Sequence, residues 1–231
     1  MINVIVIGGT NSTIGVSLCN QLKNDGHNVI STHYSKDVME SKIQSFFLDV
    51  TKEESVKEFV EKVYAKYKEI HCLINNAGVF KGELLTSSRL SNWEHIIDVN
   101  LMGVYNTCKF FSKKMISVNK GKIINISSTK GFNGDIGGSA YAVSKAGVTS
   151  LSKALAKELA KFNISVNVVC PGYIKSNINS FGKLGLEDNQ NCSYFDISNN
   201  LSNVCNFISF LTSDKMVGVT GQVFNIDSRI F

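Results

Sequence analysis

The stretch that decides the fold reads NVIVIGGTNSTIG and covers residues 3–15. Its first half, Asn3–Ile7, is a short run rich in β-branched residues and predicts a strand, whereas Ile14–Lys23 has a helical pattern. Glycine and small polar residues, Gly8–Gly15, join the two. Such a turn lets backbone N–H groups and the positive end of a helix approach a phosphate. A plain glycine-rich turn would have the same composition, so the turn alone is a weak signal.

The same alternation of strand and helix continues along the chain. Strands are expected at Asn3–Ile7, Asn28–Thr32, Gln44–Leu48, His71–Ile74, Lys122–Ile126, Ser165–Val169 and Gln222–Ile226. Helices are expected at Ile14–Lys23, Lys52–Lys68, Ser91–Met115, Tyr141–Phe162 and Leu201–Leu211. Several strands are almost continuously apolar, which is typical of a parallel sheet covered by helices on both faces. We therefore predict an α/β fold: one Rossmann-type domain over residues 1–231 with a doubly wound parallel β-sheet.

The composition agrees with a globular protein and disfavours several classes. The 231 residues are 43% hydrophobic and 19% charged, with a net charge of +5 that is not gathered into a basic run. We therefore expect no nucleic-acid partner, and with no long apolar run or signal pattern we expect no membrane partner. The six cysteines and four histidines lack metal-ligand spacing, so no metal site is expected. Reduced cysteines in the cytoplasm are the expected state.

Ligands of such sheets bind at the carboxyl ends of the strands, so the segments after the strands carry the candidate functional residues. Asp49-Val50-Thr51 follows the third strand, where a helix cap is the alternative interpretation. Asn75-Asn76-Ala77-Gly78 follows the fourth strand and also suits a turn. Ser127-Ser128 after the fifth strand could be another polar turn, and Pro171-Gly172 after the sixth could simply open a loop.

Two further patterns lie within expected helices. Tyr141 and Lys145 are four residues apart and therefore share a helix face. An ammonium beside a phenol favours the phenolate and lowers the pKa of the tyrosine, which makes it usable as an acid or base near neutral pH. Asn is mildly unfavourable in a helix, so Asn100 suggests a local role. A single Y-x-x-x-K pattern is common by chance and is informative only together with the other segments.

Taken in order, these segments resemble the short-chain dehydrogenase/reductase family along essentially the whole chain. The family's T-G-x-x-x-G-x-G corresponds to Gly8–Gly15, its N-N-A-G to Asn75–Gly78, its Y-x-x-x-K to Tyr141–Lys145 and its P-G to Pro171-Gly172. Its adenine-side aspartate, helix asparagine and serine correspond to Asp49, Asn100 and Ser128. The layout is most similar to that of the 3-oxoacyl-(acyl-carrier-protein) reductases of fatty acid biosynthesis.

The resemblance implies an NAD(P)-dependent reductase in which hydride passes to a carbonyl carbon while Tyr141 gives its proton to the oxygen. Ser128 would hold that oxygen, Lys145 would lower the tyrosine pKa and hold the nicotinamide ribose, and Asn100 would anchor a water chain. The residues implied as cofactor contacts are Gly9, Asn11, Ser12, Thr13, Ile14, Gly15, His33, Lys36, Asp49, Val50, Asn76, Ala77, Gly78, Tyr141, Lys145, Pro171, Gly172, Ile174 and Ser176. A homotetramer built on the two longest helices and a substrate lid over residues 173–201 are also implied.

Several positions depart from the family pattern. Thr13 replaces a glycine of the phosphate loop, where its side chain could crowd the pyrophosphate or bind it through the hydroxyl. The usual D-G-G near the end of the chain is Asp227-Ser228-Arg229. Ser176 replaces a threonine and keeps the hydroxyl expected to meet the nicotinamide carboxamide. The catalytic matches favour an active enzyme, while a weak or inactive dinucleotide-binding regulator remains the alternative.

The choice of cofactor depends on the end of the second strand, where NAD-preferring members carry an aspartate. That place is His33 here, and Asp37 comes four residues later. A 2′-phosphate is therefore not repelled and could bind His33, Ser35 or Lys36, so we predict NADP(H) over NAD(H). The substrate is less defined: a 3-oxoacyl thioester on a carrier protein, a sugar or a small ketone. Lys122 matches a basic position that these reductases use to meet the acidic carrier, unless it is simply an exposed lysine.

Overall fold

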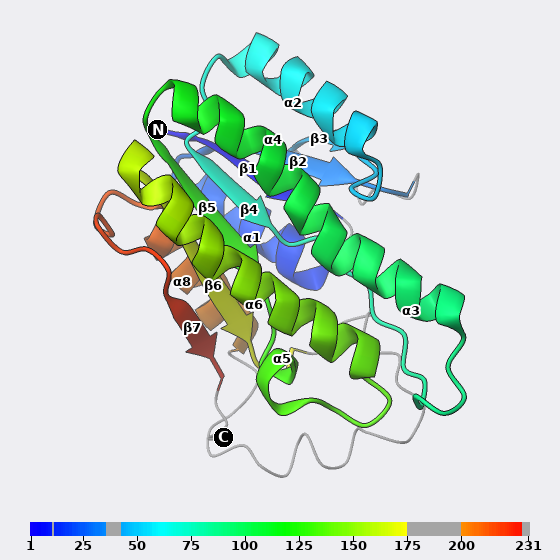
Figure 1. Cartoon of the computed structure of the whole chain (residues 1–231). Coiled ribbons are helices and arrows are strands. Elements are labelled where there is room, and N and C mark those ends of the chain that lie inside the picture. Colours follow the sequence, from blue (N-terminus) through cyan, green and yellow to red (C-terminus); the bar gives the residue numbers. More distant parts are fainter. Residues whose placement is uncertain (11, 36–42, 175–199, 228–231) are drawn as a thin grey trace.

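A seven-stranded parallel sheet forms the centre of the protein (Figure 1). The computed structural model describes residues 1–10, 12–35, 43–174 and 200–227. The strands are β1 (Asn3–Ile7), β2 (Asn28–His33), β3 (Gln44–Phe47), β4 (Cys72–Asn75), β5 (Gly121–Ile126), β6 (Ile164–Pro171) and β7 (Val223–Ile226). They lie in the order β3-β2-β1-β4-β5-β6-β7, and every neighbouring pair is parallel. The predicted doubly wound sheet is confirmed.

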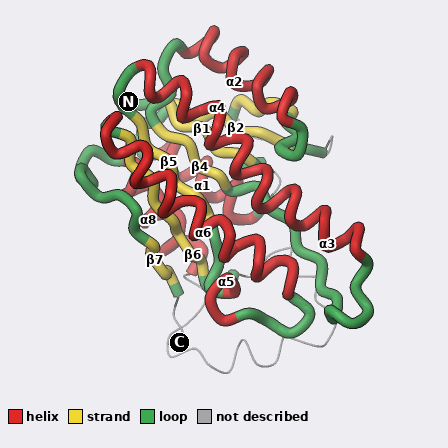
Figure 2. The backbone as a smooth tube through the Cα atoms, in the orientation of Figure 1, coloured by secondary structure: helices red, strands yellow, loops and turns green. Residues whose placement is uncertain are grey.

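Helices cover both faces of the sheet (Figure 2). They are α1 (Thr13–Asn24), α2 (Glu53–Tyr67), α3 (Leu90–Ile97), α4 (Gly103–Ser117), α5 (Lys130–Asn133), α6 (Ser139–Leu159) and α8 (Asn200–Thr212). In Figure 1, α2, α4 and α6 lie on one face, and α1 and α8 lie on the other. None of the helices in the described ranges is long and apolar enough to cross a membrane.

Strand β1 shows why its sequence is apolar at every position. Successive side chains of a strand point to opposite faces. Ile5 and Ile7 are buried in the hydrophobic cluster beneath α2, α4 and α6. Val4 and Val6 are buried in the cluster beneath α1 and α8. A strand covered on both faces has no position for a solvated side chain, which accounts for the continuous run.

The chain order places a switch point between β1 and β4. From β1 the chain continues to β2 and β3 on one side, and then crosses to β4 on the other side. The last residues of these neighbouring strands, Ile7 and Asn75, are paired in the register. The segments that follow them therefore begin side by side, at the place where ligands of open α/β sheets bind.

Two features differ from the expected elements. The helix predicted at Ser91–Met115 is divided into α3, a π-helical segment at Asp98–Met102 and α4. The short helix α5 was not predicted, because four residues are too few to show a helical period. Most of the predicted lid at 173–201 lies outside the described residues.

Candidate active site

The turn after β1 is packed so closely that several positions accept only glycine. Gly8 has a φ of +74°, and its N–H donates to Thr32 Oγ1 at 2.9 Å. A Cβ on Gly9 would lie 2.4 Å from the hydroxyl oxygen of Ser31. A Cβ on Gly15 would lie 2.5 Å from the Gly8 carbonyl oxygen. Gly8, Gly9 and Gly15 therefore have no side chains where the turn packs against its neighbours and meets the start of α1.

The start of α1 is held by two polar side chains. Ser12 caps the helix by accepting a hydrogen bond from the Gly15 N–H at 3.0 Å. Asn76 donates to Ser12 Oγ and to the Gly8 carbonyl, both at 3.0 Å, and so joins the end of β4 to the turn. The N–H groups of Thr13 and Ile14 have no acceptor within the helix, because no turn precedes them.

These features fit the pyrophosphate of a dinucleotide. First-turn N–H groups and the positive end of a helix favour an anion, and the glycines let the turn pack closely against its neighbours. Thr13 is the first residue of α1, and its φ is not among the positive values, so the backbone there does not require the family's glycine. Asn11, predicted as a contact, lies outside the described residues.

The predicted adenosine-side residues lie at the ends of β2 and β3. His33 ends β2, and its Nδ1 lies 2.7 Å from Ser45 Oγ. Asp49 Oδ1 accepts hydrogen bonds from the Thr51 N–H at 3.0 Å and the Thr51 hydroxyl at 2.6 Å, which stabilise the turn before α2. The helix cap considered for Asp49 is wrong, because Lys52 is the N-cap residue of α2 and no side chain caps it. Lys36 lies outside the described residues.

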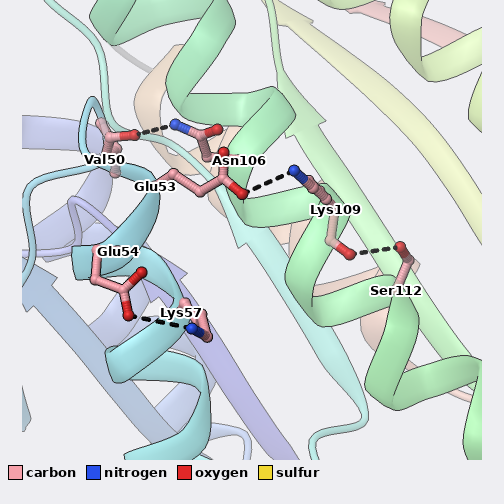
Figure 3. A network of polar contacts seen from close by, with 7 residues as sticks. All are labelled: Val50, Glu53, Glu54, Lys57, Asn106, Lys109 and Ser112. Atoms are coloured by element: carbon pink, nitrogen blue, oxygen red, sulfur yellow. Dashed lines mark hydrogen bonds and ion pairs between the residues drawn. The ribbon is translucent and has the colours of Figure 1, made fainter.

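A hydrogen bond from helix α4 fixes the backbone of Val50 (Figure 3). The buried Asn106 of α4 donates to the Val50 carbonyl at 2.9 Å. An ion pair between Lys109 and Glu53, with 2.8 Å between Nζ and Oε1, joins α4 to α2 beside it. The loop that carries Asp49 and Val50 is therefore bonded to α4, which is itself joined to α2.

Asn100 lies in the π-helical segment and is fully buried. Its Oδ1 accepts from the Val79 N–H at 2.7 Å, and its Nδ2 donates to the Val79 carbonyl at 2.9 Å and to Ser144 Oγ at 3.1 Å. Asn100 therefore holds the segment after Ala77 and Gly78 with its own side chain. A Cβ on Gly78 would lie 3.3 Å from Asn100 Oδ1 and 3.6 Å from Lys145 Nζ, so Gly78 leaves space between these two groups.

Tyr141 stands in the first turn of α6 and packs edge-on against Phe80, with 5.3 Å between ring centres. Burial raises the pKa of Tyr141 to about 12, and a hydrogen bond from the Ser128 hydroxyl acts in the opposite direction. The lowered pKa predicted from the nearby ammonium is therefore wrong for this structure, because removal of the phenol from water has the larger effect. Ser128 Oγ also accepts from the Lys130 N–H at 3.2 Å.

Lys145 is 4% exposed, and its ammonium donates to the Ile126 carbonyl at 2.9 Å. Its Nζ lies 5.6 Å from the centre of the Tyr141 ring. Burial lowers the pKa of Lys145 to about 8, while the Cys170 thiol acts in the opposite direction. Tyr141 and Lys145 of α6 therefore lie near Ser128, which follows β5, and near Asn100 of the π-helical segment. Their catalytic roles stay predictions.

The Pro171-Gly172 segment ends β6 beside β7. The Gly172 N–H donates to the Ile226 carbonyl at 2.9 Å, and a Cβ on Gly172 would lie only 2.0 Å from Asp227 Cγ. The Ile174 side chain is 8% exposed and belongs to the core cluster, so a contact between Ile174 and a cofactor would involve its backbone atoms. Ser176 lies outside the described residues.

Lys122 lies away from the residues described above. It stands at the amino end of β5, at the edge of the sheet opposite the site. Its ammonium donates to the carbonyls of Thr212 and Ser213, where α8 ends. A cation on the last carbonyls of a helix stabilises that helix end. Lys122 therefore fastens α8 to the sheet and is not simply exposed, while its contact with a carrier stays a prediction.

Three residues near the site were not singled out from the sequence: Phe80, Ser144 and Ser45. Ser144 precedes Lys145, so its position in the motif was the available signal. Phe80 and Ser45 gave no signal, because their contacts depend on how distant segments pack. In the part of the chain that the structure describes, no three His, Cys, Asp or Glu side chains gather as a metal site.

A glycine-rich turn at the switch point, with a tyrosine, a lysine and a serine beside it, is typical of a dinucleotide-dependent oxidoreductase. The model for the short chain dehydrogenase family matches residues 3–183. The 3-oxoacyl-(acyl-carrier-protein) reductase FabG of Thermotoga maritima is 37% identical over 240 residues, covering 98% of this chain and 97% of the relative. The corresponding FabG of Staphylococcus epidermidis is 32% identical over 239 residues, covering 98% of both chains.

Solved structures agree with these relatives. The structure described as ElxO with NADP bound has a TM-score of 0.86 and 29% sequence identity, covering 98% of this chain and 97% of its own. A tyrosine-to-phenylalanine variant of ElxO with NADPH bound gives the same values. The chain belongs to the short-chain dehydrogenase/reductase family and is an NAD(P)-dependent oxidoreductase most like FabG.

Proposed function

We propose that this protein reduces a carbonyl to an alcohol with NADP(H), and that Tyr141 is the proton donor. The observation that carries the proposal is the grouping of Tyr141 with Lys145, whose Nζ lies 5.6 Å from the centre of the Tyr141 ring, and with Ser128, whose hydroxyl acts to lower the pKa of Tyr141. Tyr141 can give a proton to a substrate oxygen, Ser128 can donate a hydrogen bond to the same oxygen, and Lys145 supplies a positive charge. Asn100, through Ser144 and Val79, holds the adjacent segments in place.

The directions of the pKa shifts suit this role. The raised pKa of Tyr141 keeps the phenol protonated at neutral pH, which is the state that can give a proton to a carbonyl oxygen. The bound dinucleotide would supply the hydride. As the proton leaves, the phenolate is stabilised by the Ser128 hydroxyl and by the charge of Lys145. Ser128 would polarise the carbonyl by donating to the same oxygen.

The solved relative with NADP bound and the absence of a carboxylate at His33 support NADP(H) as the cofactor. The predicted contacts among the described residues would then meet it from the turn, the ends of β2 and β4, and Pro171-Gly172. The curated relatives' names support a 3-oxoacyl thioester on an acyl carrier protein as substrate.

We also propose the single-domain organisation with a substrate lid over residues 173–201, and a homotetramer built on the longest helices. The exposed Tyr105 of α4 and Val143 of α6, 40% and 50% exposed, would be covered in such an assembly. Light scattering on the purified protein tests this assembly directly. A monomer at working concentration would contradict it.

The enzymatic proposal is tested by following NADPH oxidation with a panel of carbonyl compounds. Acetoacetyl thioesters should be reduced faster than a sugar or a simple ketone, at equal concentration. Tyr141→Phe, which keeps the ring and removes the hydroxyl, is the matched control. NADPH binding without turnover of any compound would favour the catalytically weak or regulatory alternative. Faster reduction of sugars or small ketones would contradict the proposed thioester substrate but would still support carbonyl reduction as the reaction.

A further inference from the structure

Hydrogen bonds join a row of side chains near the phosphate turn. His33 Nδ1 lies 2.7 Å from Ser45 Oγ, and Ser45 Oγ lies 3.3 Å from Thr10 Oγ1. The Thr10 hydroxyl in turn donates to the Thr32 carbonyl at 3.3 Å. The row therefore links the end of β2 to the phosphate turn through Ser45 of β3.

The contact with Ser45 engages one of the two ring nitrogens of His33. Its Nδ1 lies at hydrogen-bond distance from Ser45 Oγ, so Nε2 is the ring nitrogen left to meet a ligand. An N–H group at Nε2 would donate a hydrogen bond to a phosphate oxygen.

The row is also attached to the part of the site that receives phosphate. The Gly8 N–H donates to Thr32 Oγ1 at 2.9 Å, so the phosphate turn is bonded to the residue just before His33. Thr10 is 1% exposed, whereas His33 is only partly buried. One end of the row is therefore shielded from water, while the imidazole end remains accessible to a ligand.

The local charge is compatible with a phosphate at His33. The described segments at the ends of β2 and β3, residues 28–35 and 43–47, contain no carboxylate. An aspartate at the end of β2 would instead bond the ribose hydroxyls of NAD and repel a phosphate. Ser45 reaches His33 from β3, whose register places Ser45 opposite Ser31 and Phe47 opposite His33.

We propose that Ser45 and Thr10 are positioning residues that orient His33 toward the 2′-phosphate of NADP(H). Selection of the phosphorylated cofactor then depends on β3 and the phosphate turn as well as on the end of β2. The inference rests on the proposed function, because it requires that the protein bind NADPH. Neither Ser45 nor Thr10 would touch the phosphate in this arrangement.

The test measures the dissociation constants of NADPH and NADH by dinucleotide fluorescence, which requires no turnover. Ser45→Ala should weaken NADPH binding about tenfold relative to NADH, because the imidazole loses the hydrogen-bond partner that fixes it. Ser45→Thr keeps the hydroxyl and should retain the preference. Thr10→Val should reduce the preference less than Ser45→Ala, because Ser45 itself remains. Ser165→Ala, at the amino end of β6, is the matched control and should leave the preference unchanged.

A double-mutant cycle separates positioning from a general structural effect. If Ser45 acts through His33, then Ser45→Ala added to His33→Ala should cause no further loss of NADPH preference. Equal weakening of both dinucleotides by Ser45→Ala, or full additivity in the double variant, would overturn the inference and leave the proposed function standing. A wild-type protein that binds neither dinucleotide would instead overturn the proposed function.

Discussion

The Lys145 ammonium donates a hydrogen bond to the Ile126 carbonyl at 2.9 Å, and the side chain is 4% exposed. Among the residues that the structure describes, Lys145 belongs to none of the ion pairs. A buried ammonium held by a peptide carbonyl keeps little of the stabilisation that water gave it. Its pKa falls to about 8 for that reason, which makes Lys145 a source of pH-dependent stability.

The first prediction concerns the free energy of unfolding between pH 8 and pH 10. An unfolded lysine has a pKa near its model value of 10.5, so in this range the unfolded chain holds a proton that folded Lys145 has lost. Stability rises with pH wherever the unfolded state binds more protons. Lys145 should therefore contribute an increase in stability of up to about 3 kcal/mol from below pH 8 to above pH 10.5.

Urea unfolding of wild type and Lys145→Met at a series of pH values measures this contribution. The methionine variant keeps an unbranched side chain and removes the titrating group, so the other titrations cancel in the difference between the two proteins. As the pH rises, the free energy of unfolding of the wild type should increase relative to that of Lys145→Met. A difference that does not change with pH would show that Lys145 keeps an ordinary pKa in the fold.

The second prediction concerns the Tyr141 hydroxyl. Tyr141→Phe should lower kcat by about 100-fold or more, because the proton donor is lost. The packing of the ring against Phe80, at 5.3 Å between ring centres, should remain. NADPH affinity and the thermal unfolding midpoint should therefore stay close to those of the wild type. Turnover near the wild-type rate would remove Tyr141 from the proposed chemistry.

The third prediction concerns Thr13, the first residue of α1. Its side chain is partly exposed beside N–H groups that have no acceptor in the helix, so we expect its hydroxyl to bind the pyrophosphate. Thr13→Val, which keeps the shape, should weaken NADPH and NADH alike, by about tenfold. Thr13→Ser should keep most of the affinity. Tighter binding by Thr13→Gly than by wild type, measured by fluorescence titration, would show that the side chain crowds the ligand instead.

The architecture was predictable because its signals are local. The apolar run Asn3–Ile7 and the glycines after it are consecutive in the chain, and a strand covered on both faces requires such a run. The grouping of Tyr141 with Lys145 was predictable for the same reason, since both lie on one helix. Ser128 joined them because parallel strands end at one edge of the sheet.

The rest of the site depends on contacts between distant segments. Ser45 meets His33 through the pairing of β3 with β2, a register that the sequence does not specify. The raised pKa of Tyr141 results from burial, which became visible only once the chain was packed. The capping of α8 by Lys122 joins positions 90 and 91 residues apart, so no local pattern indicated it.

The fourth prediction concerns Gly172, whose position would place a Cβ 2.0 Å from Asp227 Cγ. Gly172→Ala should lower the free energy of unfolding by about 1–3 kcal/mol, because the segment must move away from β7. It should also weaken dinucleotide binding, since Pro171-Gly172 is a predicted cofactor contact. Asp227→Gly removes the obstructing carboxylate, so the double variant should lose less stability than the sum of the single variants. Additive losses in urea unfolding would mean that Asp227 is not what excludes a side chain at Gly172.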